Sequence, residues 1–180
     1  MRARNFFVFV FALFLLVTPS VSRAQTSIAV VDVQALMTES EAAKNVQKQI
    51  ETQREQFLSE LSKLEQDLRK SEKDLADQQS TLPKEDFAKK KQEFETKFLE
   101  ARRLAQKRKK ALDDASTKAM GKLREEILKI VGVIAEQKGY SLVLSRQNVV
   151  IGDKSMDISE EAMKELNKAI SKITLEVDAN

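Results

Sequence analysis

The residues best suited to chemistry are basic side chains clustered near the middle of the sequence. Arg102–Arg103 and Lys107–Lys110 lie close together, and Arg103, Lys107 and Lys110 recur at a spacing that places them on one face of a helix. Guanidinium and ammonium groups in such a stripe attract anions, so the candidate ligands are acidic proteins, the phosphates of lipopolysaccharide, or an anionic membrane surface. The alternative is a solvated helix face that pairs with acidic residues earlier in the chain: Glu51, Glu55, Glu60 and Glu65.

A second group of candidate residues is apolar and could contact an unfolded partner. These residues lie beside the predicted hydrophobic seam of a helical hairpin, where they would be exposed: Leu58, Phe87, Leu99 and Leu104. Three phenylalanines, Phe57, Phe94 and Phe98, fall in seam positions instead. We predict that these three pack between the two helices.

The sequence offers little support for catalysis. The chain contains no His and no Cys, so the side chains that most often act as general base, as nucleophile or as a transition-metal ligand are missing. No glycine-rich phosphate loop is present, and no spacing places a pair of carboxylates in a buried pocket. We therefore expect a protein that is not an enzyme and that uses neither a cofactor nor a metal.

The elements that must position these residues are two long helices. Residues 41–80 and 84–138 carry apolar side chains at heptad positions, and Thr81–Pro83 breaks the pattern between them. A turn this short makes the two helices antiparallel neighbours. Alanines occupy much of the second helix's seam, and polar residues interrupt the seam, so we expect a slim projection that can bend: Arg54, Ser71, Gln78 and Arg108.

Short apolar segments at both ends of the chain predict a small β-rich body. Residues 28–33 are predicted to form one strand, and residues 140–144 and 149–151 a hairpin of two more, followed by an amphipathic helix from about Asp157 through Ile173. So few residues rarely supply a sufficient core alone, and their sheet edges need partners. The body is therefore predicted to be an oligomeric hub built on β-strand residues: Ile28, Val30, Val33, Leu142, Leu144 and Val150.

The N-terminus predicts export. Residues 1–24 combine Arg2 and Arg4 with an apolar run from Phe6 to Val17 and a cleavage site ending at Ala24, which is the pattern of a signal peptide. Three of the 31 basic residues lie in this segment and none of the 28 acidic ones does, so the remainder of the chain has no net charge. This balance argues against a nucleic-acid ligand, which would require a basic domain. A soluble periplasmic protein is expected.

Several segments in this order resemble the Skp (OmpH) family of periplasmic chaperones. They are Ile28–Gln34 after a leader, the long charged hairpin, Lys138–Leu144 and Asp157–Glu161. The resemblance implies a homotrimer with a small β-barrel body and three helical tentacles around a cavity. It also implies ATP-independent capture of unfolded outer-membrane proteins before membrane insertion. One departure is the neutral charge of this chain, because well-known family members are strongly basic, and a lipopolysaccharide-binding motif cannot be aligned.

The predicted architecture is therefore α+β and mainly α, with a long antiparallel hairpin projecting from a small strand body that trimerises. The predicted signal peptide is 1–24, the body 25–40 and 139–175, the hairpin 41–138 with its tip near 81–83, and the C-terminal tail 176–180. The leading functional hypothesis is a holdase chaperone. A structural or adaptor coiled-coil protein of the cell envelope shares the same periodicity and is the alternative.

Overall fold

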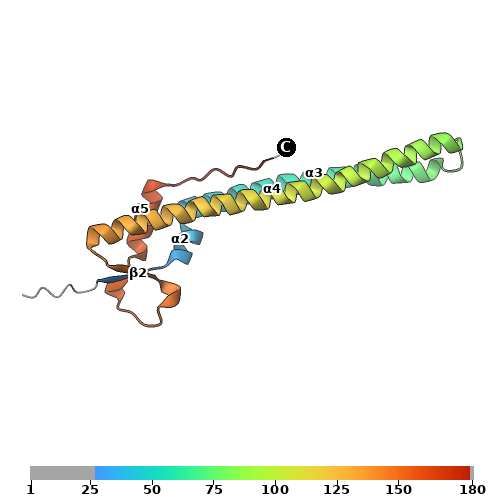
Figure 1. Cartoon of the computed structure of the whole chain (residues 1–180). Helices are drawn as coiled ribbons and strands as arrows, with labels where there is room; N and C mark the ends of the chain where they lie inside the picture. The colour runs from blue at the N-terminus through green and yellow to red at the C-terminus, as the bar shows by residue number, and fades with distance from the viewer. Residues whose placement is uncertain (1–26, 179–180) are drawn as a thin grey trace, which may run out of the picture.

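A computed structural model describes residues 27–178, in which a long helical hairpin projects from a small body that contains two strands (Figure 1). This arrangement confirms the predicted fold class, α+β and mainly α. The predicted signal peptide, residues 1–24, lies outside the described residues.

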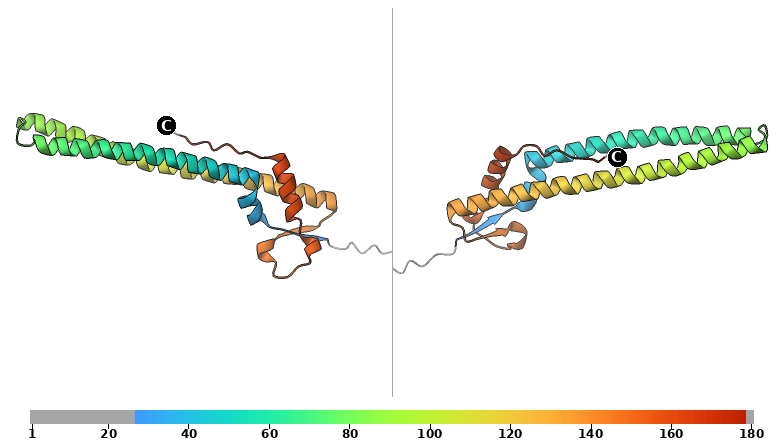
Figure 2. Two further views of the ribbon diagram at one scale, coloured as in Figure 1. Left: turned by 180° about the vertical axis from the view of Figure 1, so that it is seen from behind. Right: turned by 45° about the horizontal axis from the view of Figure 1, so that its top comes forward.

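The hairpin consists of α3 (Glu41–Gln78) and α4 (Lys84–Lys138). The hydroxyl of the buried Ser40 caps α3 by accepting a hydrogen bond from the Ala43 backbone N–H at 3.2 Å. Pro83 directly precedes α4, whose first turn carries Glu85 and Asp86 near the positive end of the helix dipole. Figure 2 shows that the two helices stay side by side from the body to the tip.

The seam between the two helices is thin. Between residues 47 and 114 no side chain is fully buried, and the apolar seam residues of α3 are only partly covered. A pair of helices has no third element to close over the seam, so each large side chain remains open on one side. Phe98 illustrates this most clearly: it was predicted to lie in the seam, but it is 42% exposed.

The body forms where the two ends of the chain meet. Strand β1 (Ile28–Val31) pairs in parallel with β2 (Leu142–Ser145), with Ile28 opposite Leu142 and Val31 opposite Ser145. The hairpin is thus inserted between two paired strands. Helix α2 (Val33–Glu39) follows β1, and α5 (Ser159–Ala169) follows two single 3₁₀ turns, η1 (Arg146–Asn148) and η2 (Lys154–Met156).

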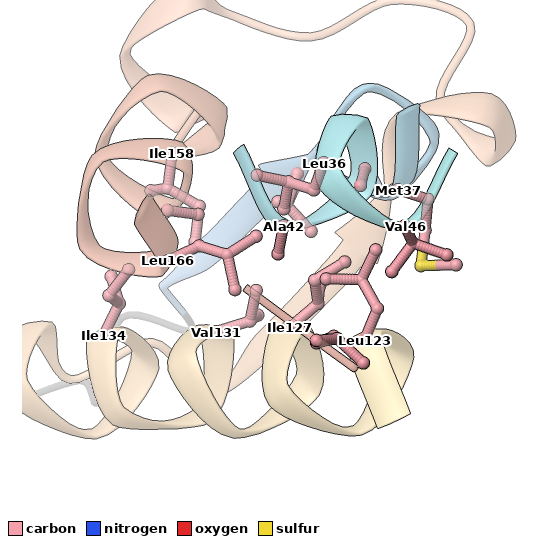
Figure 3. Close-up of a cluster of buried hydrophobic side chains, with 14 of the residues drawn as sticks. Leu36, Met37, Ala42, Val46, Leu123, Ile127, Val131, Ile134, Ile158 and Leu166 are labelled. Atoms are coloured by element: carbon pink, nitrogen blue, oxygen red, sulfur yellow. The ribbon is translucent and has the colours of Figure 1, made fainter. Parts of the chain in front are cut away.

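The body's core lies on the last turns of α4. Figure 3 shows Leu123, Ile127, Val131 and Ile134 of this helix pointing into one cluster with side chains from the other body elements. The partners come from α2, from the start of α3, and from α5 with the residue before it: Leu36, Met37, Ala42, Val46, Ile158 and Leu166. These partners come from both ends of the chain, so the body's core includes residues on both sides of the hairpin in the sequence.

The predicted strand at residues 149–151 is wrong for the single chain. Residues 146–148 form η1, and Val150 and Ile151 are 98% and 91% exposed. The predicted antiparallel pairing fails because β2 pairs in parallel with β1. Strand β2 also begins two residues later than predicted, because Gly139, in the left-handed conformation, and Tyr140 end α4 by hydrogen bonding to Glu136 and Ala135.

The terminal helix is shorter than predicted. It ends at Ala169, and Ile170 already has an extended backbone with φ −149° and ψ 116°. Residues 171–178 continue without helical structure and run back along the hairpin (Figures 1 and 2). The apolar residues Ile170 and Ile173, which match a helical spacing, therefore pack in an extended segment, and Ile173 is 5% exposed there.

Candidate functional site

The basic stripe Arg103, Lys107 and Lys110 lies on the exposed face of α4. The Lys110 Nζ lies 2.6 Å from the Asp114 Oδ2 one turn later, and this hydrogen bond, with the attraction between the two charges, raises the pKa of Lys110. Within residues 27–178, Arg103 and Lys107 form no ion pair. Two of the three cations therefore remain available to an anionic partner.

The alternative interpretation of the stripe required ion pairs between the two helices. Glu51, Glu55, Glu60 and Glu65 are all exposed on α3, and none of them forms an ion pair with α4 in the described part of the chain. Near the tip, the Lys90 Nζ donates a hydrogen bond to the Gln78 Oε1 at 2.5 Å. The excess positive charge of α4 is thus not neutralised by α3.

Three of the four candidate apolar contacts are exposed as the heptad pattern predicts. Leu58, Leu99 and Leu104 are 57%, 53% and 42% exposed, whereas Phe87, near the start of α4, is partly buried. They come from both helices, Leu58 from α3 and the other three from α4. Together they can contact an extended partner at several points.

Sequence reasoning missed Phe98 as a surface residue. Its ring stacks on Phe94, with 6.2 Å between the centroids, and the Arg102 guanidinium lies 5.7 Å from its centroid. This arrangement presents an aromatic face and a cation side by side, a combination that favours acidic and apolar groups in one partner. Periodicity alone could not find it, because its heptad position matches that of buried residues.

The predicted body residues divide into a covered and an exposed group. Val30 is buried, Ile28, Val33 and Leu144 are partly buried, and Leu142 is 46% exposed. The β1–β2 pair brings Ile28, Val30, Leu142 and Leu144 together, while Val33 starts α2 and Val150 lies outside the sheet on the exposed segment after η1.

A polar network joins the two ends of the chain within the body. The Asp32 carboxylate accepts from the Ala35 N–H at 2.9 Å, while the Asp32 N–H donates to the Ser159 Oγ at 2.8 Å. The Ser159 hydroxyl donates to the Asp157 Oδ1 at 2.5 Å, and the Arg146 guanidinium pairs with the other Asp157 oxygen. These residues carry much of the family resemblance, and their role here is to fix β1 against the start of α5.

Residues 27–178 contain no group of three or more side chains placed to hold a metal ion. No helix in that range is long and apolar enough to cross a membrane. The seam near the body holds one small cavity of about 40 Å³, bordered by Phe57, Arg108 and Leu112.

Comparisons with a family model and with solved structures both give matches. A sequence model of the family described as outer membrane protein (OmpH-like) matches residues 27–166. A crystal structure from Caulobacter crescentus CB15, described as an outer membrane chaperone (OmpH-like), superposes with a TM-score of 0.79 at 19% identity, covering 87% of this chain and 95% of that chain. The sequence matches none of the curated proteins with which it was compared.

We predict that Asp157 stabilises the body in a pH-dependent manner. Burial alone would raise the pKa of its carboxyl group, but the hydrogen bonds from Ser159 and the Arg146 charge lower it below the ordinary value of 3.8. The ionised form is therefore favoured in the folded state. The stability that the ionised Asp157 side chain gives the folded state is complete above pH 3.8. It is lost as the pH falls through the lowered pKa of the folded state.

Asp157→Ala should lower the free energy of unfolding by about 1 kcal/mol at pH 7, because it removes the hydrogen bonds from Ser159 and the ion pair with Arg146. This deficit should shrink as the pH falls below 3.8 and through the lowered pKa of the folded state, because the carboxylate is then protonated in the native protein as well. Denaturant unfolding at several pH values measures the difference in unfolding free energy between the wild type and the variant. Asp113→Ala, on the exposed face of α4, is the matched control. A deficit that stays constant down to pH 3 would contradict the assignment.

Proposed function

The chain belongs to the OmpH-like family of outer membrane proteins, and from this premise we propose that it is an ATP-independent holdase chaperone of the periplasm. Its clients are unfolded outer-membrane β-barrel proteins, which it keeps from aggregating before they insert into the membrane. A signal peptide, residues 1–24, directs its export. The resemblance of its fold to the OmpH-like outer membrane chaperone from Caulobacter crescentus supports this proposal.

The observation that carries the proposal is the mixture of exposed apolar and basic residues along the distal part of the hairpin, where residues 47–114 include no buried side chain. Leu58, Leu99, Phe98 and Leu104 are each at least 42% exposed, and the basic stripe lies on the same stretch of α4 as the last three. Each contact with a client is weak, and many together hold it. A client bound in this way can leave without nucleotide hydrolysis, because no single contact limits its release.

The basic stripe speeds the first encounter with a client more than it strengthens the bound complex. Exposed charges act over about 8 Å at physiological ionic strength, so they draw an acidic segment toward the hairpin before close contact forms. The same stripe suits the phosphates of lipopolysaccharide or an anionic membrane surface, where the client is delivered. The neutral net charge beyond residue 24 keeps this attraction local to α4.

We further propose that three chains form a homotrimer through the body, residues 25–40 and 139–175, with three hairpins of residues 41–138 around the client. Strand β2 has no partner on its outer edge among the described residues. Leu142, Val150 and Ile151 are exposed beside or beyond that edge. An apolar surface and an open strand edge both gain stability from contact with a second chain.

The holdase proposal predicts that the distal hairpin is required for protection. Residues 58–105 can be replaced by a short Gly-Ser linker, because no residue in this range is buried and the core of the body lies elsewhere. The shortened chain should keep its body folded but lose protection of an unfolded β-barrel protein, followed by light scattering without nucleotide. Leu58→Ala serves as the control and should change protection little.

Full protection by the shortened chain would refute client binding by the hairpin. Failure of the full-length protein to prevent aggregation would instead favour the alternative, a structural coiled-coil protein of the envelope.

The trimer proposal predicts that Val150→Asp dissociates the oligomer without unfolding the chain. The side chain is 98% exposed in one chain, so the substitution removes no contact within it. In the trimer the same carboxylate would be buried without a partner, at a cost of several kcal/mol. Analytical ultracentrifugation should show monomers with an unchanged circular dichroism spectrum, whereas Gln147→Asp, in the exposed turn η1, should remain trimeric. A trimeric Val150→Asp protein would exclude this surface from the interface.

A further inference from the structure

We propose that the seam of the hairpin beside Gln49 is a binding site for extended polypeptide segments in which apolar and polar residues alternate. The chain's own C-terminal segment, residues 170–178, occupies this site as a resident ligand that a client displaces. The inference rests on the proposed function, because it assumes that the clients are unfolded polypeptides. It specifies which kind of client segment binds and where.

The first support is recognition of backbone atoms by one side chain. The Gln49 Nε2 donates to the Ile173 carbonyl oxygen at 2.7 Å, and the Gln49 Oε1 accepts from the Leu175 N–H at 3.0 Å. A side-chain amide that bonds one C=O and one N–H of an extended chain replaces the edge of a neighbouring strand. Asn45 fixes the amide, since its Oδ1 accepts from the same Nε2 at 2.7 Å.

The second support is the alternation of the side chains that follow. Ile173 is 5% exposed and Leu175 and Val177 are partly buried, while Thr174, Glu176 and Asp178 are exposed. This is the period of two that a β-strand shows, so the segment presents one apolar row to the hairpin. The site therefore selects a pattern, apolar at every second position, more than a particular sequence.

The third support is that contacts to the segment come from both helices. Val177 borders the small cavity in the seam together with Phe57 of α3 and Leu112 of α4. Glu176 pairs with Lys122 at 3.2 Å and Asp178 with Lys118 at 4.0 Å, both from α4. The segment thus lies over the seam, and lysines favour acidic residues at its exposed positions.

The site is larger than its resident. Beside the segment lies a hollow of about 310 Å³, lined by Gln49, Gln53 and Leu175 among others. Side chains bulkier than leucine can enter this space. The exposed positions of the segment make only surface contacts, and exposed ion pairs contribute little to binding. The resident ligand is therefore held mainly by Ile173, Leu175 and the Gln49 amide.

The chemistry of the ligand follows from these contacts. Membrane-spanning β-strands alternate apolar and polar residues with this period, so an unfolded outer-membrane protein carries many such segments. The tethered segment competes with them at an effective concentration in the millimolar range. A single client strand would not displace it readily, but a client held at several points along three hairpins would.

The test uses a fluorescent synthetic peptide with the sequence of residues 171–178 and a control peptide of the same composition with its three apolar residues adjacent. The proteins are the full-length chain, a chain ending at Ile170, and the full-length Leu175→Asp/Val177→Asp variant. The last keeps every backbone atom of the segment but releases it. Fluorescence anisotropy measures binding, and circular dichroism with thermal unfolding verifies the fold.

We expect the peptide to bind the truncated chain and the double variant at least about tenfold more tightly than the full-length chain, which competes with its own segment. Gln49→Ala in the truncated background should weaken binding about tenfold, the loss expected from two backbone hydrogen bonds. The control peptide should bind weakly to all proteins. Equal binding of both peptides, equal binding to all chains, or no binding to a folded double variant would overturn the inference.

A parallel aggregation assay separates this inference from the proposed function. If the full-length and truncated chains both protect an unfolded β-barrel protein but neither binds the peptide, the site is wrong and the holdase proposal stands. If the peptide binds as expected but no chain protects the client, the site is supported and the holdase proposal fails.

Discussion

The packing of both chain ends against the last turns of α4 is the interaction on which the structure depends. Leu123, Ile127, Val131 and Ile134 form one apolar stripe, which is covered by α2 and the start of α3 on one side and by α5 on the other. The β1–β2 pair joins segments that lie on either side of the hairpin in the sequence. Most of the buried apolar side chains in residues 27–178 lie in this cluster, so the body fixes the geometry of the hairpin's base.

The rest of the hairpin has the opposite property, because its side chains are not buried. Between residues 47 and 114 the two helices cover only one side of each seam residue. Their apolar surface is left partly open, and within residues 27–178 the cations of α4 form no ion pair with an acidic side chain of α3. Surface that a folded domain would bury is thereby offered to another polypeptide. A rigid base and a weakly packed projection together suit the capture of clients that have no fixed shape.

The sequence predicted the parts of the fold that depend on local pattern. The heptad repeat, the Pro83 break and the apolar runs of β1 and β2 each correspond to an observed element, and the same frame predicted the exposure of Leu58, Leu99 and Leu104. The sequence did not predict the structure where contacts between distant residues determine it. Residues 149–151 have strand propensity but no strand partner in one chain, and Ile170 and Ile173 fit a helix yet pack in an extended segment. The bonds from Gln49 to that segment join residues more than a hundred positions apart, so no local pattern could predict them. That the exposed residues bind clients remains a prediction.

The central claim is that the body holds the assembly and the hairpin holds the client. Hydrogen exchange of the full-length protein, with and without an unfolded outer-membrane β-barrel protein, tests it most directly. Client binding should slow exchange in both helices over residues 58–105, where backbone hydrogen bonds are protected by little packing, and leave the amides beneath Leu123–Ile134 unchanged. Slower exchange confined to the body, with the distal hairpin unaffected, would contradict this account.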